Sequence, residues 1–251
     1  PRKPFRAPMN YLKSFWSVKK GKYDLVINVV EGSSSGRLLT QLANSKYKVF
    51  GTSETFHFSN FPDFSHIAKK PVYTLRNYLS LLESAKGQVP VAHLDLKLTS
   101  DEIEKGKNTL QEITRNSKKS LCIFTFATGE KCLSKTWWKE FYSLLKSDFP
   151  NYNIIEILPV ENVSQIDFEA PSFYSKDVRE IAAFIANTEV FIGADSGIMH
   201  LASSSKTPTV GLFSVSDADM YMPYNTKSIA LNTEKNPVEK CSQIVAEILN
   251  S

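Results

Sequence analysis

Residues 191–204 read FIGADSGIMHLASS, and this stretch decides the fold. An apolar segment with the length of a buried strand ends at Ala194, and a helix is predicted to begin at Gly197. A second apolar segment, TVGLF at 209–213, follows shortly afterwards. Strand, helix and strand in this order predict a parallel crossover, and open parallel sheets bind ligands beyond the carboxyl ends of their strands. The Asp-Ser-Gly sequence between Ala194 and Ile198 is therefore a candidate ligand site.

The residues of this turn have the chemistry that a phosphate group needs. Ser196 offers a hydroxyl, Gly197 lets a ligand approach the backbone, and the start of a helix presents free N–H groups with a partial positive charge. His200 lies three residues into the helix and can face the same side as Ser196 and Gly197. The alternative is structural, since Asp195 and Ser196 are also good helix caps and His200 can be a satisfied core histidine.

The composition is that of a folded protein with a mild excess of positive charge. The 251 residues are 42% hydrophobic, enough for one large or two small domains, and the formal net charge is +4. That charge is too small to predict nucleic-acid binding, but it suits an anionic nucleotide sugar or a phosphorylated lipid surface. The three cysteines lack paired spacing and indicate reduced thiols in a cytoplasmic protein. Neither a transmembrane helix nor a signal peptide is predicted.

Strand and helix patterns alternate along much of the chain. Tyr23 to Val30 is predicted as a buried strand that leads through a helix into a second strand. Further helices are predicted over residues 72–86 and 100–115. From residue 120 the alternation becomes regular and predicts a Rossmann-like sheet with helices on both faces.

The polar segment Asn116-Ser117-Lys118-Lys119-Ser120 is the predicted domain boundary, because it carries no apolar anchor. It gives a partial N-terminal, acceptor-side domain of residues 1–118. The C-terminal, nucleotide-sugar-binding domain then spans residues 119–251.

The pattern Asp195-Ser196-Gly197-x-x-His200-Leu-Ala, followed by Val-Gly-Leu-Phe, closely resembles the C-terminal signature of glycosyltransferase family 9. These are the ADP-heptose:lipopolysaccharide heptosyltransferases of Gram-negative bacteria. The resemblance covers most of residues 20–250, strongly after residue 120 and loosely before it. It implies an α/β, GT-B-like fold in which two Rossmann-like domains face a cleft. Family members begin with a strand and a Gly-Asp loop that supplies the proposed catalytic base. This chain has no such segment, so we expect an incomplete N-terminal domain and a base that lies before Pro1.

The resemblance implies an inverting, metal-independent transfer of a heptose or related sugar. The donor would be an ADP-sugar and the acceptor a lipopolysaccharide core or another glycan. The protein would be cytoplasmic, with a peripheral contact at the inner membrane, and would need no cofactor and bind no nucleic acid. Without the base, the alternative is a catalytically inactive nucleotide-binding remnant of the family. A sugar-nucleotide epimerase of similar fold would need more acids and histidines around the cleft.

The second candidate stretch is ATGEKCLSKTW at 127–137, directly after the first strand of the C-terminal domain. Family members carry a loop there that ends in Lys-x-Trp, and its lysine neutralises the diphosphate. Lys135 matches that spacing, and Lys131 is the second choice. The resemblance gives Thr128 a hydroxyl contact and Gly129 a close backbone approach. Without the resemblance, solvated lysines in a polar loop are the simpler interpretation.

Glu169 is the remaining donor-site candidate. It precedes Ser175 at about the distance at which the family has an acid before a helix start, and a carboxylate can accept both ribose hydroxyls. An exposed glutamate is an equal interpretation. The loop 31–36 suits either an acceptor-side role or a plain connection. Asp217-Ala218-Asp219 has the spacing of a metal-binding motif, but its surroundings indicate an exposed turn, and no metal site is predicted.

Overall fold

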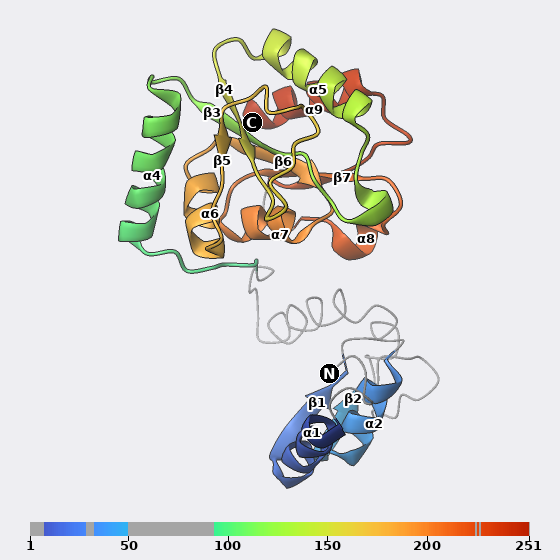
Figure 1. The fold of residues 1–251 in the computed structure, drawn as a ribbon. Coiled ribbons are helices and arrows are strands. Elements are labelled where there is room, and N and C mark those ends of the chain that lie inside the picture. The colour runs from blue at the N-terminus through green and yellow to red at the C-terminus, as the bar shows by residue number, and fades with distance from the viewer. Residues whose placement is uncertain (1–7, 29–32, 50–92, 224, 226, 251) are drawn as a thin grey trace, which may run out of the picture. The chain divides into compact units, whose positions relative to one another are not determined.

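The structure is a computed structural model that describes residues 8–28, 33–49, 93–223, 225 and 227–250. The chain divides into two compact units, Pro1–Ala92 and His93–Ser251. Figure 1 shows the elements of each unit. None of the helices in the described ranges is long and apolar enough to cross a membrane.

The described part of the N-terminal unit contains two parallel strands. β1 (Lys22–Ile27) pairs with β2 (Asn44–Val49). α1 (Pro8–Lys20) precedes β1, and α2 (Ser34–Leu42) connects the two strands. The predicted strand, helix and strand are confirmed, whereas the predicted helix over 72–86 and part of the loop 31–36 lie outside the described residues.

The C-terminal unit is built on a parallel sheet with the strand order β5-β4-β3-β6-β7-β8. The chain runs outward from β3 to one edge, then returns to β6 beside β3 and runs to the other edge. The bounds are β3 (Ser120–Phe124), β4 (Asn153–Ile157), β5 (Ser172–Phe173), β6 (Val190–Ala194), β7 (Thr209–Phe213) and β8 (Ile229–Asn232). β3, β6 and β7 are buried along their whole length, because helices cover both faces of a parallel sheet.

Two layers of helices cover this sheet (Figure 1). α5 and α9 pack on one face, and α6 and α7 pack on the other, with α4 outside α6. The bounds are α4 (Ser100–Thr114), α5 (Lys135–Asp148), α6 (Val178–Ile185), α7 (Gly197–Ser204), the short α8 (Ala218–Tyr221) and α9 (Val238–Leu249). The predicted Rossmann-like domain is confirmed.

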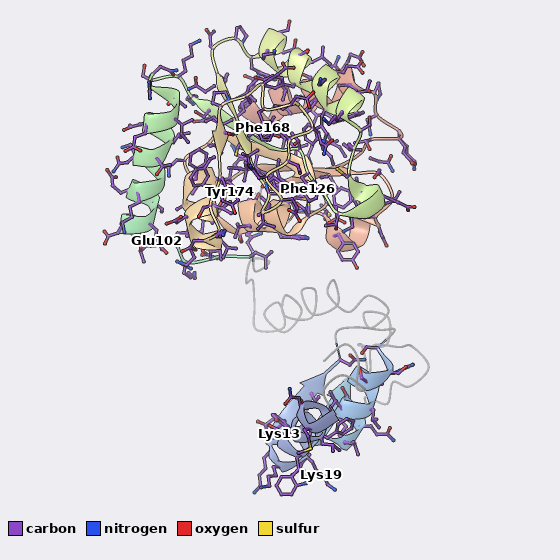
Figure 2. All side chains as sticks on the ribbon, viewed as in Figure 1. Lys13, Lys19, Glu102, Phe126, Phe168 and Tyr174 are labelled. Atoms are coloured by element: carbon purple, nitrogen blue, oxygen red, sulfur yellow. The ribbon has the colours of Figure 1, made fainter. Side chains whose placement is uncertain are left out.

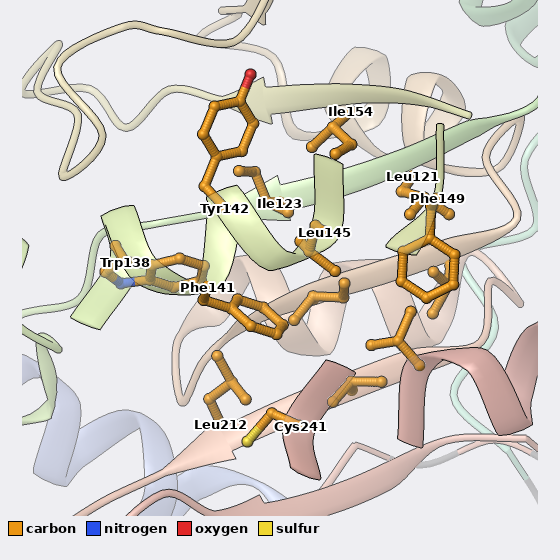
Figure 3. Close-up of a cluster of buried hydrophobic side chains, with 14 of the residues drawn as sticks. Leu121, Ile123, Trp138, Phe141, Tyr142, Leu145, Phe149, Ile154, Leu212 and Cys241 are labelled. Carbon is orange, nitrogen blue, oxygen red and sulfur yellow. The ribbon is translucent and has the colours of Figure 1, made fainter. Parts of the chain in front are cut away.

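Aromatic side chains of α5 fill the core on its face of the sheet (Figure 3). Trp138 and Phe141 are fully buried against a cluster that includes Leu121 and Ile123 of β3. Ser134 begins this helix by accepting a hydrogen bond from the backbone N–H of Trp137 at 3.2 Å. The packing fixes α5, and with it the loop that connects β3 to α5.

The predicted domain boundary after Lys118 is corrected by the packing of α4. A Cβ atom added to Gly106 of α4 would lie 2.3 Å from the backbone oxygen of Ala183 in α6, so the two helices touch through their backbones. Arg179 of α6 forms an ion pair with Glu102 of α4. α4 therefore belongs to the C-terminal unit, which begins at His93.

The polar segment that suggested the boundary is instead a turn within this unit. The side-chain amides of Asn116 and Asn153 form two reciprocal hydrogen bonds of 3.0 Å, which join the segment to β4. A polar segment whose side chains bond to another part of the fold has the same composition as an exposed linker.

Candidate functional site

The candidate site lies where β3 and β6 end. These strands are neighbours in the sheet although β4 and β5 come between them in the sequence. The chain leaves β3 toward one edge of the sheet and leaves β6 toward the other, and this reversal of direction is where open parallel sheets bind ligands. Both stretches singled out in the sequence, residues 127–137 and 195–200, follow these two strands.

Two glycines leave the backbone of these loops open. A Cβ atom added to Gly197 would meet no heavy atom within 4 Å, and the same holds for Gly129. Gly129 also has a φ of +66°, a left-handed conformation that favours glycine. It begins a single 3₁₀ turn, Gly129–Lys131, and Thr128 before it is exposed. Backbone groups of both loops can therefore be approached closely by a ligand.

Ser196 caps α7, as the structural alternative predicted. Its φ of −155° is extended, and its hydroxyl accepts a hydrogen bond from the backbone N–H of Met199 at 3.3 Å. The cap leaves the hydroxyl proton of Ser196 able to donate, because the oxygen is the atom that accepts. A capping role and a ligand contact are thus compatible at this residue.

Lys131 and Asp195 join the two loops. The Lys131 Nζ lies 3.0 Å from the Asp195 Oδ2, and the Asp195 side chain is only 6% exposed while that of Lys131 is 40% exposed. A buried carboxylate needs a partner, and Lys131 supplies it. An ammonium group has three N–H donors, so Lys131 can serve Asp195 and still offer donors to a ligand.

His200 stands beside this pair and is partly buried. Burial lowers the pKa of His200 below its ordinary value, the negative charge of Asp195 opposes the change, and the positive charge of Lys131 adds to it. The imidazole is therefore neutral at neutral pH, with one nitrogen that donates and one that accepts. It can donate to a ligand oxygen without adding a charge.

The lowered pKa of His200 predicts a pH dependence of stability. Below about pH 6.5 this histidine binds a proton more readily in the unfolded chain than in the folded one. The free energy of unfolding therefore decreases as the pH falls. Wild-type protein should therefore lose more stability between about pH 7.5 and pH 5.5 than the His200→Gln variant, as measured by urea unfolding. Equal losses in both proteins would show that His200 does not titrate differently on folding.

The structure places Lys135, the first choice for the diphosphate, against a different carboxylate. The Lys135 Nζ lies 2.6 Å from the Asp167 Oδ1, and the Asp167 Oδ2 lies 2.6 Å from the Nζ of Lys139. Asp167 belongs to the loop after β4, the strand beside β3. Figure 2 labels Phe126 and Phe168, which mark the loops after β3 and β4.

Glu169, the ribose candidate, lies against α5. Its Oε2 is 3.7 Å from the Nζ of Lys146, and its side chain is about half exposed. The two interpretations of this residue, an exposed glutamate and a ribose contact, both stay compatible with that position.

Glu156 and Thr125 form a buried hydrogen-bonded pair that the sequence analysis did not predict. Glu156 of β4 is 0% exposed, and its Oε1 accepts a hydrogen bond of 2.5 Å from the hydroxyl of Thr125, which in turn accepts from the backbone N–H of Gln165 at 3.0 Å. Burial raises the pKa of Glu156. The signal available in the sequence was a lone acid inside the apolar run NIIEI at 153–157.

Within the described ranges, no three side chains of His, Cys, Asp or Glu gather closely enough to hold a metal ion. α8 begins at Ala218, inside the Asp217-Ala218-Asp219 motif, and the side chain of Asp219 is outside the described part of the chain.

Comparison with known proteins gives a consistent result. Residues 176–248 match the model of glycosyltransferase family 9 (heptosyltransferase), which confirms the resemblance inferred from the sequence. None of the curated proteins matches the chain.

Several solved structures share the fold. A glycosyl transferase family 9 protein from Veillonella parvula is 14% identical, with a TM-score of 0.62 over 96% of this chain and 77% of that one. ADP-heptose lipopolysaccharide heptosyltransferase II of E. coli is 13% identical, with a TM-score of 0.61 over 98% and 82%. E. coli heptosyltransferase WaaC, solved with ADP, is 14% identical, with a TM-score of 0.59 over 99% and 81%. The chain thus has a GT-B-like heptosyltransferase fold over most of its length.

Proposed function

Because residues 176–248 match the model of glycosyltransferase family 9, we propose that this protein is a glycosyltransferase that uses a nucleoside diphosphate sugar. The donor is an ADP-activated heptose or related sugar, and the acceptor is a lipopolysaccharide core or similar glycan at the inner face of the membrane. The observation that carries the proposal is the pair of open glycine loops at the ends of β3 and β6, joined by the Lys131–Asp195 ion pair.

Charge stabilisation is the chemistry that this site suits. Sugar transfer leaves a nucleoside diphosphate, and its growing negative charge must be neutralised as the bond to the sugar breaks. The N-terminus of α7 offers free backbone N–H groups with a partial positive charge, and Lys131 and Lys135 offer full charges. This set supports a transfer that is independent of a metal ion.

The individual residues then take separate roles. Gly197 and Gly129 allow the diphosphate to approach the two loops, and the hydroxyls of Ser196 and Thr128 donate to its oxygens. Asp195 is an anion, so its role is to hold Lys131 in place and not to contact phosphate. His200 donates one further hydrogen bond to the ligand, and Glu169 is the candidate for the ribose hydroxyls.

Removing either lysine should weaken ADP binding. Lys131→Ala and Lys135→Ala should each cost roughly 1–3 kcal/mol of binding free energy, the value of a hydrogen bond to a charged group. Isothermal calorimetry with ADP measures the loss. Lys227→Ala is the matched control, because this exposed lysine precedes β8 at the opposite end of the sheet.

The same preparations test the reaction itself. Unchanged ADP affinity in both lysine variants would contradict the proposed site. Binding of ADP without transfer of the sugar from ADP-heptose would instead favour the alternative of a nucleotide-binding protein without catalytic activity.

A further inference from the structure

Asp167 holds two lysines with a single carboxylate. Lys135 and Lys139 lie one turn apart at the start of α5, and each ammonium is 2.6 Å from a different oxygen of Asp167. Two adjacent cations that share one two-oxygen anion have the geometry that also suits a phosphate group, which presents similar oxygens. The Asp167 carboxylate therefore occupies a position between two ammonium groups that a phosphate group can also occupy.

The backbone that carries Asp167 is firmly held. Asp167 and its neighbour Phe168 have φ values of 54° and 60°, a conformation that is costly for residues other than glycine. The Ser164 hydroxyl accepts hydrogen bonds from the backbone N–H groups of Ile166 at 3.1 Å and Phe168 at 3.0 Å, and the Ile166 side chain is fully buried. These hydrogen bonds and the buried Ile166 side chain stabilise a strained turn. In this turn the Asp167 carboxylate contacts two lysines of α5.

The ion pairs themselves are easily exchanged. The side chains of Lys135, Asp167 and Lys139 are 58%, 48% and 46% exposed, so water and salt weaken their attraction. The two lysines lower the pKa of Asp167 to about 2, which keeps the carboxylate charged throughout the physiological range. An entering anion can therefore replace the carboxylate at little cost, without any change of protonation.

We propose that Lys135 and Lys139 together bind the diphosphate of the donor, and that Asp167 is an internal counter-ion which this diphosphate displaces. Lys139 is then a second binding cation that the Lys-x-Trp motif does not include. The identity of the ligand rests on the proposed function, whereas the competition between Asp167 and a phosphate group rests on the contacts alone.

The test removes the charge of Asp167 and keeps its shape. Asp167→Asn suits the left-handed backbone, which asparagine adopts readily. Calorimetry with inorganic pyrophosphate and with ADP at low salt should show affinity that is higher by roughly three- to fivefold, the scale of an exposed ion pair. The gain should shrink at high salt. Lys139→Ala should lower the affinity and should cancel the gain in the double variant.

Glu161→Gln is the matched control, because it removes one negative charge from an exposed position on the same loop. It should change the affinity less than Asp167→Asn does. Unchanged or weaker binding of both anions to folded Asp167→Asn protein would overturn the inference, even if wild-type protein binds ADP. The converse result separates the two proposals: if Asp167→Asn strengthens pyrophosphate binding while ADP binds no tighter than pyrophosphate, the inference holds and the nucleotide-sugar function fails.

Discussion

Gly197→Val should lower ADP affinity at least about tenfold, or about 1.4 kcal/mol, while leaving the fold intact. The valine side chain has room in the unliganded protein, because a Cβ at this position meets no heavy atom within 4 Å. It would fill the space from which a ligand reaches the N-terminus of α7, and it would cover the backbone N–H groups there. Loss of binding without loss of stability distinguishes a ligand-binding glycine from one required by packing.

The measurement pairs calorimetry with a thermal melt of the same samples. The melting midpoint of Gly197→Val should stay within about 2 °C of wild type, as expected for an exposed substitution. Gly129→Ala provides a contrast, since its positive φ makes it lose stability by about 1 kcal/mol as well as binding. Wild-type affinity in Gly197→Val would mean that the diphosphate does not approach this turn.

The parallel sheet could be predicted from the sequence because its strands are short, continuous apolar runs. SLCIF, VFIGA and TVGLF are each buried along their whole length, and the first two are each followed by a predicted helix. β5 was not predicted, since two residues, Ser172 and Phe173, carry no periodicity. Its pairing with β4 is decided by the sheet edge and not by its own sequence.

The candidate site was predictable in part. Asp195, Ser196 and Gly197 were found because a strand end and a helix start adjoin in the sequence. The carboxylate partners of the two lysines were not predicted, because Asp195 is 64 positions from Lys131 and Asp167 is 32 positions from Lys135. Contacts of this kind depend on which strands become neighbours, and local sequence does not determine the order of the strands in the sheet.

The prediction of the domain boundary was wrong for a related reason. A polar segment at 116–120 has the composition of a linker, whereas the contact that decides the boundary is between Gly106 and Ala183. A glycine in the middle of a helix costs stability relative to alanine, by roughly 0.5–1 kcal/mol. The close approach of α6 accounts for this glycine, and the sequence analysis did not predict that contact.

Gly106→Val should therefore destabilise the C-terminal unit by about 2–3 kcal/mol. The new side chain would meet the backbone oxygen of Ala183 and the backbone N of Phe184, which cannot turn aside as a flexible side chain can. α4 and α6 would have to separate, which also strains the ion pair of Arg179 with Glu102. Urea unfolding gives the free energy, and the melting midpoint should fall by roughly 5–10 °C.

Lys107→Val is the control, because it places the same valine side chain on α4 at an exposed position. Lys107 is the exposed neighbour of Gly106 on the same helix, so its substitution should change stability by no more than about 0.5 kcal/mol. If α4 were instead part of the N-terminal unit, the two variants would affect the unfolding of the sheet equally little. A large loss confined to Gly106→Val is expected if α4 is an outer layer of the C-terminal unit, because Gly106 touches α6 through the backbone and Lys107 faces solvent.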